Sequence, residues 1–343
     1  MQHFFEQINI ALKEGRNFVL VSIISSTGST PRGDGAKMAV FENGQTLGTI
    51  GGGAVEYVST KAALEGFSKR ASWSRVFSLT PGDKAELGMV CGGRVEVCFL
   101  YIDAGNERFG RMIGRILAAY KENLDTWLVT KLVDKAAEDM GIYDPIHGLQ
   151  FLKERPKLPD GWEERLFKRV PVLLEGNPSW FGEPLTRSGY TYIFGGGHVA
   201  QALVPVISNL EFKTIVYEDR KEFCNAKLFP GVHKVIYGEF LKISEEITLT
   251  GRDFVIIMTR GHQCDYEVLT QILKCPVAYI GVIGSRNKIA RTKERLLDDG
   301  FSLKDIERVH WPIGLPVKAK TPAEIAISIA AELILCRANL WEA

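Results

Sequence analysis

The most specific chemical signal in the sequence is a glycine turn at residues 195–200. It follows a short apolar run and reads Gly195-Gly196-Gly197-His198-Val199-Ala200, which matches the dinucleotide fingerprint with alanine at its third position. The first glycine permits the tight turn, the next lets backbone N–H groups approach a phosphate, and the following helix adds a partial positive charge. We therefore expect a phosphate-bearing ligand at this turn. The alternative is a purely structural joint between a strand and a helix.

An acidic pair lies where the ribose of a dinucleotide is usually held. Glu218 ends the next predicted strand, 21 residues after Gly197, and Asp219 competes with it for the same role. Arg220 follows directly and could favour a phosphorylated ribose or cap a helix in solvent. We include all three residues in the predicted ligand site.

Two later predicted strands also end in polar residues. The carboxyl ends of parallel strands line one crevice, so these residues should lie near the glycine turn. His262 and Asp265 could form an acid–base pair, since a carboxylate partner fixes the imidazole tautomer, or Asp265 could cap a helix. Gly284, Ser285 and Arg286 could add to an anion site, with a solvated Arg286 as the alternative.

The first of three glycine clusters in the N-terminal half is the polar loop at 26–37. Its glycines at 28 and 33 have P-loop spacing, but Asp34 stands where the phosphate-binding lysine must be, so the loop is no Walker motif. It still carries two cations, Arg32 and Lys37, among free backbone N–H groups. An anion could therefore bind there.

The other two clusters follow at 51–53 and 91–93. Gly51-Gly52-Gly53 opens a predicted helix that carries Glu56, and this helix N-terminus could hold an anion. Cys91 precedes Gly92-Gly93 in a glycine turn, and Arg94 is close enough in sequence to favour its thiolate. Cys91 is thus a candidate functional thiol, although a single cysteine is most often inert and buried.

The elements that must position these residues differ between the two halves of the chain. Apolar spacing in the first half predicts helices at 4–13, 54–70 and 107–122 and strands at 17–24, 37–41, 46–50, 94–102 and 127–133. From residue 190 the order becomes strand, glycine turn and helix in repetition, which is typical of a parallel sheet. Strands are predicted at 191–194, 214–217, 254–258 and 277–282, and a final helix at 322–335.

These patterns predict an α/β protein with two domains. Residues 1–188 should form a mixed α+β domain, and residues 189–343 a Rossmann-like domain with a parallel sheet. The proline-rich segment 135–188 is hard to interpret, because it could be a linker or pack through its aromatic and aliphatic residues. We assign it to the first domain.

Length and composition exclude several classes of protein. The 343 residues suit two domains, and 42 Lys+Arg against 41 Asp+Glu leave a net charge of +1, which argues against nucleic-acid or membrane partners. No apolar run approaches the ~20 residues of a membrane span, and the N-terminus lacks a secretory pattern. The six cysteines include no Cys-x-x-Cys pair, so we expect a cytoplasmic protein without a metal site of its own.

Together the motifs resemble the XdhC/CoxI family, the xanthine dehydrogenase accessory factors. The N-terminal half carries the family patterns Gly28-Ser29-Thr30-Pro31-Arg32 through Met38, Gly51 through Glu56, and Cys91-Gly92-Gly93. The C-terminal half resembles the family's Rossmann domain at 195–200, 218–223, 262–265, 284–286 and 322–329. Both ends of the chain and several motifs between them carry the resemblance.

The resemblance implies a molybdenum-cofactor chaperone rather than an enzyme. Such a protein binds the molybdenum cofactor (molybdopterin), supports exchange of a terminal oxo for a sulfido ligand, and delivers the cofactor to a xanthine dehydrogenase-type molybdenum hydroxylase. We accordingly expect that hydroxylase and a cysteine desulfurase as partners, and a homodimer. One alternative is an NAD(P)-dependent oxidoreductase, which the glycine turn alone would support. The other is a nucleotide-gated regulatory module without catalysis.

Overall fold

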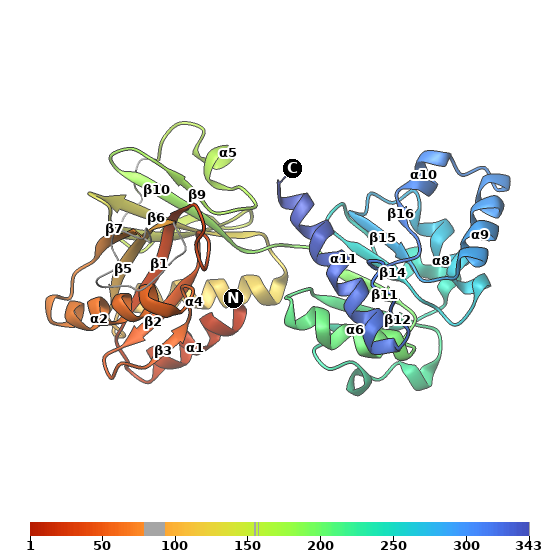
Figure 1. The fold of residues 1–343 in the computed structure, drawn as a ribbon, viewed down its shortest axis with the longest axis horizontal. Coiled ribbons are helices and arrows are strands. Elements are labelled where there is room, and N and C mark those ends of the chain that lie inside the picture. The colour runs from red at the N-terminus through yellow and green to blue at the C-terminus, as the bar shows by residue number, and fades with distance from the viewer. Residues whose placement is uncertain (79–92, 154–155, 157, 343) are drawn as a thin grey trace. The chain divides into compact units, whose positions relative to one another are not determined.

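The chain forms two compact units, each with its own hydrophobic core. The computed structural model describes residues 1–78, 93–153, 156 and 158–342. The N-terminal unit is Met1–Arg187 and the C-terminal unit is Ser188–Ala343 (Figure 1), so the division falls one residue before the predicted boundary. Within the described ranges, no helix is both long and apolar enough to cross a membrane.

The N-terminal unit contains two five-stranded antiparallel sheets. The first has the order β3-β2-β1-β5-β4, and the second the order β8-β7-β6-β10-β9. The first sheet consists of β1 (Phe18–Thr27), β2 (Lys37–Phe41), β3 (Thr46–Gly48), β4 (Trp73–Ser78) and β5 (Arg94–Ile102). The second consists of β6 (Thr126–Val133), β7 (Ala136–Asp144), β8 (Gly148–Phe151), β9 (Val172–Leu174) and β10 (Ser179–Thr186). Among the described residues of this unit, the helices are α1 (Gln2–Lys13), α2 (Gly53–Lys69), α4 (Glu107–Glu122) and α5 (Trp162–Leu166).

The second sheet occupies most of the segment that apolar periodicity could not interpret. Its strand β7 buries Asp139 and Asp144, which interrupt the alternation of apolar residues expected of a strand. Both carboxylates accept backbone N–H groups, Asp139 from Met140 at 2.8 Å and Asp144 from His147 at 2.8 Å. Polar burial of this kind is stable when hydrogen-bonded, but it conceals the strand in the sequence.

The C-terminal unit is built on six parallel strands in the order β13-β12-β11-β14-β15-β16. They are β11 (Thr191–Phe194), β12 (Thr214–Glu218), β13 (Lys234–Tyr237), β14 (Phe254–Ile257), β15 (Tyr279–Val282) and β16 (Val309–His310). The chain moves outward from β11 through β12 to β13, then returns to place β14 on the other side of β11. This reversal makes the carboxyl ends of β11 and β14 the switch point of the sheet, where the ligand crevice of such folds lies.

Helices cover both faces of the parallel sheet, because its central strands are apolar on both sides. The core against one face includes residues of α6 (His198–Asn209) and α11 (Pro322–Glu342). The core against the other includes residues of α7 (Ile243–Glu246), α8 (His262–Ile272), α9 (Arg286–Asp298) and α10 (Leu303–Glu307). The predicted fold class, a mixed α+β domain followed by a Rossmann-like domain, is confirmed.

Candidate functional site

The glycine turn joins β11 to α6 at the crevice of the C-terminal unit. Gly195 has φ +107°, and a Cβ there would lie 2.4 Å from the carbonyl oxygen of Met258, so only glycine fits. Gly197 differs, because its φ is −69° and a Cβ would meet nothing within 4 Å. An open space therefore lies at Gly197, before His198 and the N-terminus of α6, while Ala200 packs in the core beneath the helix.

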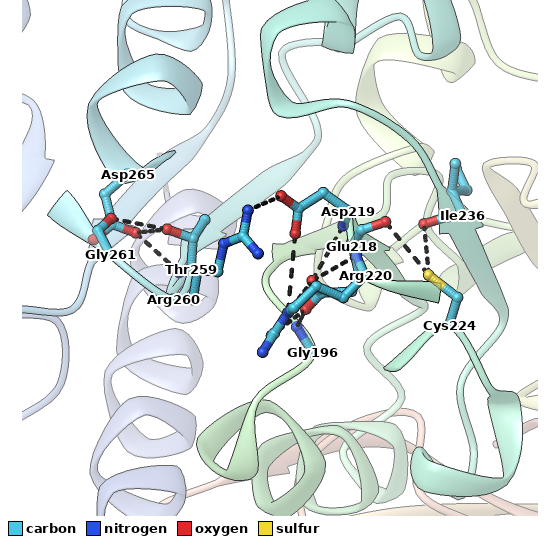
Figure 2. A network of polar contacts seen from close by, with 10 residues as sticks. All are labelled: Gly196, Glu218, Asp219, Arg220, Cys224, Ile236, Thr259, Arg260, Gly261 and Asp265. Atoms are coloured by element: carbon cyan, nitrogen blue, oxygen red, sulfur yellow. Dashed lines mark hydrogen bonds and ion pairs between the residues drawn. The ribbon is translucent and has the colours of Figure 1, made fainter. Parts of the chain in front are cut away.

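Glu218 supports the glycine turn from inside the protein (Figure 2). Its side chain is 1 % exposed, and its carboxylate accepts the Gly196 N–H at 2.6 Å. The Arg220 guanidinium donates to both carboxylate oxygens at 2.8 Å, and the backbone N–H groups of Asp219 and Arg220 donate at 3.1 Å. Burial raises the pKa of Glu218, but Arg220 and the Gly196 N–H outweigh burial and lower it to about 2.

These contacts contradict the ribose role predicted for Glu218, because five donors already use its acceptor oxygens. Arg220 is by position the N-cap residue of a short 3-10 turn at Lys221–Phe223, as the capping alternative had it, but its side chain does not cap that turn. Its guanidinium is bound to Glu218 and lies 4.0 Å from the ring centroid of Phe223, so it neither faces a phosphorylated ribose nor lies free in solvent.

Asp219 is the acidic residue that keeps an unused acceptor at the crevice. Its Oδ2 accepts from Nη2 of Arg260 at 2.9 Å. Its Oδ1 is buried and has no hydrogen-bond partner among the described residues, and Nε of Arg220 is 4.0 Å away. Burial and the Glu218 carboxylate raise the pKa of Asp219. A ligand hydroxyl could donate to Oδ2 once Arg260 leaves it.

The predicted acid–base pair of His262 and Asp265 is not formed. Asp265 is buried, and its Oδ1 accepts both the backbone N–H of Thr259 at 2.9 Å and the Thr259 hydroxyl at 2.6 Å. Its other oxygen pairs with Lys288, while His262 is exposed at the start of α8. Asp265 therefore fixes the end of β14 instead of orienting an imidazole. No sequence pattern identified Lys288 as the partner of Asp265. The general requirement that a buried carboxylate be paired with a cation was the one available indication.

The segment at 284–286 begins helix α9. Ser285 is the N-cap, and its hydroxyl accepts the Lys288 N–H at 3.4 Å. Gly284 lies against the side chain of Lys288, and Arg286 is exposed as the first residue of the helix. This arrangement fits a solvated Arg286.

In the N-terminal unit, Glu56 folds back onto the turn that precedes the helix N-terminus predicted to bind an anion. Its Oε2 accepts the Thr49 hydroxyl at 2.5 Å, the Ile50 N–H at 3.1 Å and the Gly52 N–H at 3.0 Å. The helix that follows, α2, begins at Gly53. The chain's own carboxylate thus occupies two backbone N–H groups of this turn, those of Ile50 and Gly52.

Two glycines bring the N-terminal motifs together on the polar loop. A Cβ on Gly51, whose φ is +124°, would lie 2.7 Å from Cβ of Pro31 and 3.4 Å from Cγ of Arg32. A Cβ on Gly93 would lie 2.4 Å from the Ser29 carbonyl oxygen. We call this region, made of Gly28, Ser29, Pro31, Arg32, Gly51 and Gly93, the glycine-loop surface. Cys91 and Gly92 lie outside the described residues, so their roles stay predictions.

Lys37 is not a cation of this loop, contrary to expectation. It is buried, and its Nζ bonds Oε1 of Glu183 at 2.6 Å and the Ser22 hydroxyl at 3.2 Å. Arg32 remains exposed. A ligand at the glycine-loop surface would therefore meet the guanidinium of Arg32 and not the amine of Lys37.

Comparisons with known proteins identify relatives of both units. A model described as the XdhC and CoxI family matches residues 11–76, and one described as the XdhC Rossmann domain matches residues 191–333. The chain is 26 % identical over 325 residues to the uncharacterized protein YqeB of Escherichia coli (strain K12), covering 94 % of this chain and 44 % of YqeB. It thus spans less than half the length of that relative.

A second relative matches end to end. It is a protein of Bacillus subtilis (strain 168) described as a probable xanthine dehydrogenase subunit, and the chain is 24 % identical to it over 344 residues, covering 98 % of each chain. A crystal structure of a xanthine dehydrogenase from Bacillus halodurans has a TM-score of 0.81 and 24 % identity, covering 98 % of this chain and 96 % of the other. At that identity the structural likeness supports the fold alone.

Proposed function

Because the chain belongs to the XdhC and CoxI family, we propose that it acts in the maturation of a xanthine dehydrogenase-type molybdenum hydroxylase. In this role it binds the molybdenum cofactor, supports its sulfuration by a cysteine desulfurase, and delivers it to the hydroxylase in the cytoplasm. The name of the Bacillus subtilis relative, which matches along 98 % of both chains, supports the link to xanthine dehydrogenase.

The observation that carries this proposal is the meeting of three family motifs at the glycine-loop surface. Gly51 and Gly93 have no room for a side chain where they contact the loop, so the motifs form one region. Molybdopterin carries a phosphate and a polar ring, and the exposed Arg32 suits the phosphate. Glu56 already accepts the Ile50 and Gly52 N–H groups of the neighbouring turn, and the exposed guanidinium of Arg32 is the group we assign to the phosphate. When bound, the cofactor supplies the molybdenum centre that is passed on.

Arg32 provides the test of this site. We expect Arg32→Ala to lower the pterin and molybdenum content of the purified protein and to reduce the activity of a co-expressed client hydroxylase at least tenfold. Arg111→Ala is the matched control, because Arg111 is an exposed arginine of α4 that pairs with Glu107. If Arg32→Ala retains both cofactor content and client activity, the glycine-loop surface does not hold the cofactor.

For the C-terminal unit we propose a nucleotide ligand that carries phosphate and ribose. The open space at Gly197 suits a phosphate, and the Asp219 carboxylate, whose Oδ2 now accepts from Arg260, suits a ribose hydroxyl. Because the pair of His262 and Asp265 is absent, this geometry favours binding without hydride transfer and argues against the oxidoreductase alternative. NAD or ADP-ribose should bind more tightly than NADP, since a 2′-phosphate would lie against the Asp219 carboxylate. Titration calorimetry on the full chain measures this order, and tighter binding of NADP would overturn it.

A further inference from the structure

One ion pair crosses the mouth of the nucleotide crevice. Asp219 follows β12, Arg260 follows β14, and β11 lies between these two strands in the sheet. Nη2 of Arg260 reaches Oδ2 of Asp219 at 2.9 Å, so the pair passes over the carboxyl end of β11, where the glycine turn begins (Figure 2). A ligand phosphate that approaches the turn meets this guanidinium.

The two partners are held very differently. The Asp219 side chain is 17 % exposed, and its own backbone N–H is bound to Glu218. The Arg260 side chain is 54 % exposed, and its long aliphatic stem allows it to turn toward a new partner. Ion pairs this exposed are weak in water, so a multivalent anion can separate them.

We propose that the Asp219–Arg260 ion pair is a gate that a pyrophosphate-bearing nucleotide opens by exchanging partners. Arg260 leaves Asp219 and binds the ligand phosphate, and the freed carboxylate accepts ribose hydroxyls. This inference rests on the proposed nucleotide site and adds to it how the site selects its ligand.

The gate favours nucleotides over simple phosphates. Any anion that binds Arg260 must first break the contact between Arg260 and Asp219. A nucleotide compensates, because a ribose hydroxyl donates to the Oδ2 of Asp219 that Arg260 has left. Inorganic pyrophosphate has no hydroxyl donors of this kind. When it binds, the Asp219–Arg260 contact is broken and Asp219 gains no new partner.

Asp219→Asn should therefore change the affinities for two probes in opposite directions. With inorganic pyrophosphate, the variant should bind up to about fivefold more tightly than the wild type, because Arg260 is already released. With ADP-ribose, it should bind at least tenfold more weakly, because the carboxylate that accepts the hydroxyls is lost. Titration calorimetry on the full chain gives both affinities, and circular dichroism shows that the variant is folded.

Glu222→Gln is the matched control, since it removes a nearby exposed carboxylate that has no ion pair with Arg260 among the described residues. It should shift pyrophosphate affinity less than twofold. In an Arg260→Gln background, Asp219→Asn should no longer tighten pyrophosphate binding.

The outcomes separate the gate from the site. Should the wild type bind neither ADP-ribose nor NAD, the nucleotide site itself is wrong, and the gate with it. Should it bind them while Asp219→Asn leaves pyrophosphate affinity unchanged or undetectable, or Glu222→Gln tightens it equally, the site stands and the gate is overturned.

Discussion

Gly195 and Gly197 stand two residues apart and tolerate a side chain very differently. Gly197→Val places its Cβ in open space at φ −69°, so the melting temperature should stay within a few degrees of wild type. The branched side chain fills the space where a phosphate must approach, and ADP-ribose binding should fall at least tenfold by calorimetry. If Gly197→Val binds as well as wild type, the turn is only structural.

Gly195→Ala provides the contrast. At φ +107° its Cβ would meet the Met258 carbonyl at 2.4 Å, and we expect it to cost about 2–4 kcal/mol of unfolding free energy. In Gly195→Ala, ligand binding would be lost because the fold is destabilised. In Gly197→Val, ligand binding would be lost while the fold stays intact.

Glu218 should make the C-terminal unit sensitive to acid. Its pKa is lowered to about 2 from 4.5, so its contribution to stability is complete above pH 4.5 and is lost as pH falls toward 2. Glu218→Gln should lower the unfolding free energy at pH 7 by about 1–3 kcal/mol and flatten its decline in this pH range. Urea unfolding at pH 7, 4.5 and 3 measures both effects. Glu222→Gln, on an exposed residue, should leave the pH profile unchanged.

At the scale of elements, a buried ion pair joins the two sheets of the N-terminal unit. Lys37 of β2 and Glu183 of β10 lie 2.6 Å apart, Nζ to Oε1, with side chains only 1 % and 4 % exposed. Burial raises the pKa of Glu183, and the charge of Lys37 opposes that rise. The pair ties strands from different sheets at a point that water does not reach.

Removing one partner should be far worse than removing both. Lys37→Met leaves the Glu183 carboxylate buried alone and should cost about 3–5 kcal/mol, whereas Lys37→Met with Glu183→Leu should recover much of the loss. Lys131→Met serves as the control, since its pair with Glu138 is partly exposed and should contribute about 1 kcal/mol or less. Urea unfolding of the wild type, the two single variants Lys37→Met and Glu183→Leu, their double variant and the Lys131→Met control measures these free energies, and losses in the two single variants that add up in the double variant would contradict the prediction.

Elements with regular apolar patterns could be predicted from the sequence, and those with buried polar residues could not. The strand at 94–102 and the helix at 107–122 have the predicted bounds, because their apolar residues follow the expected periods. Strand β7 was missed, because Asp139 and Asp144 are buried there with backbone partners.

The same limit applies to the site. Sequence patterns identified the loops of the candidate site, but they did not predict which groups each carboxylate in those loops would bind. Glu56, Glu218 and Asp265 were predicted to serve a ligand, yet each accepts backbone N–H groups of the turn beside it. The choice depends on which N–H groups the folded turn leaves without partners, and spacing alone does not reveal that.

At the scale of the whole molecule, each unit buries a core of its own. The fragment Ser188–Ala343 should therefore fold alone and bind ADP-ribose within about twofold of the full chain. Urea unfolding of the full chain, followed by circular dichroism and by tryptophan fluorescence, should give transitions that do not coincide. A fragment that fails to fold would show that the C-terminal unit depends on the rest of the chain.

The Glu56 carboxylate also affects how the N-terminal unit responds to free anions in solution. Because it is tethered four residues from Gly52, it meets the N–H groups of Ile50 and Gly52 at a high effective concentration, with which free phosphate and sulfate compete poorly. The turn is thereby protected from abundant metabolites that would otherwise collect on its N–H groups. Ligand binding at the neighbouring glycine-loop surface then depends on the shape of the whole ligand and not on its charge alone.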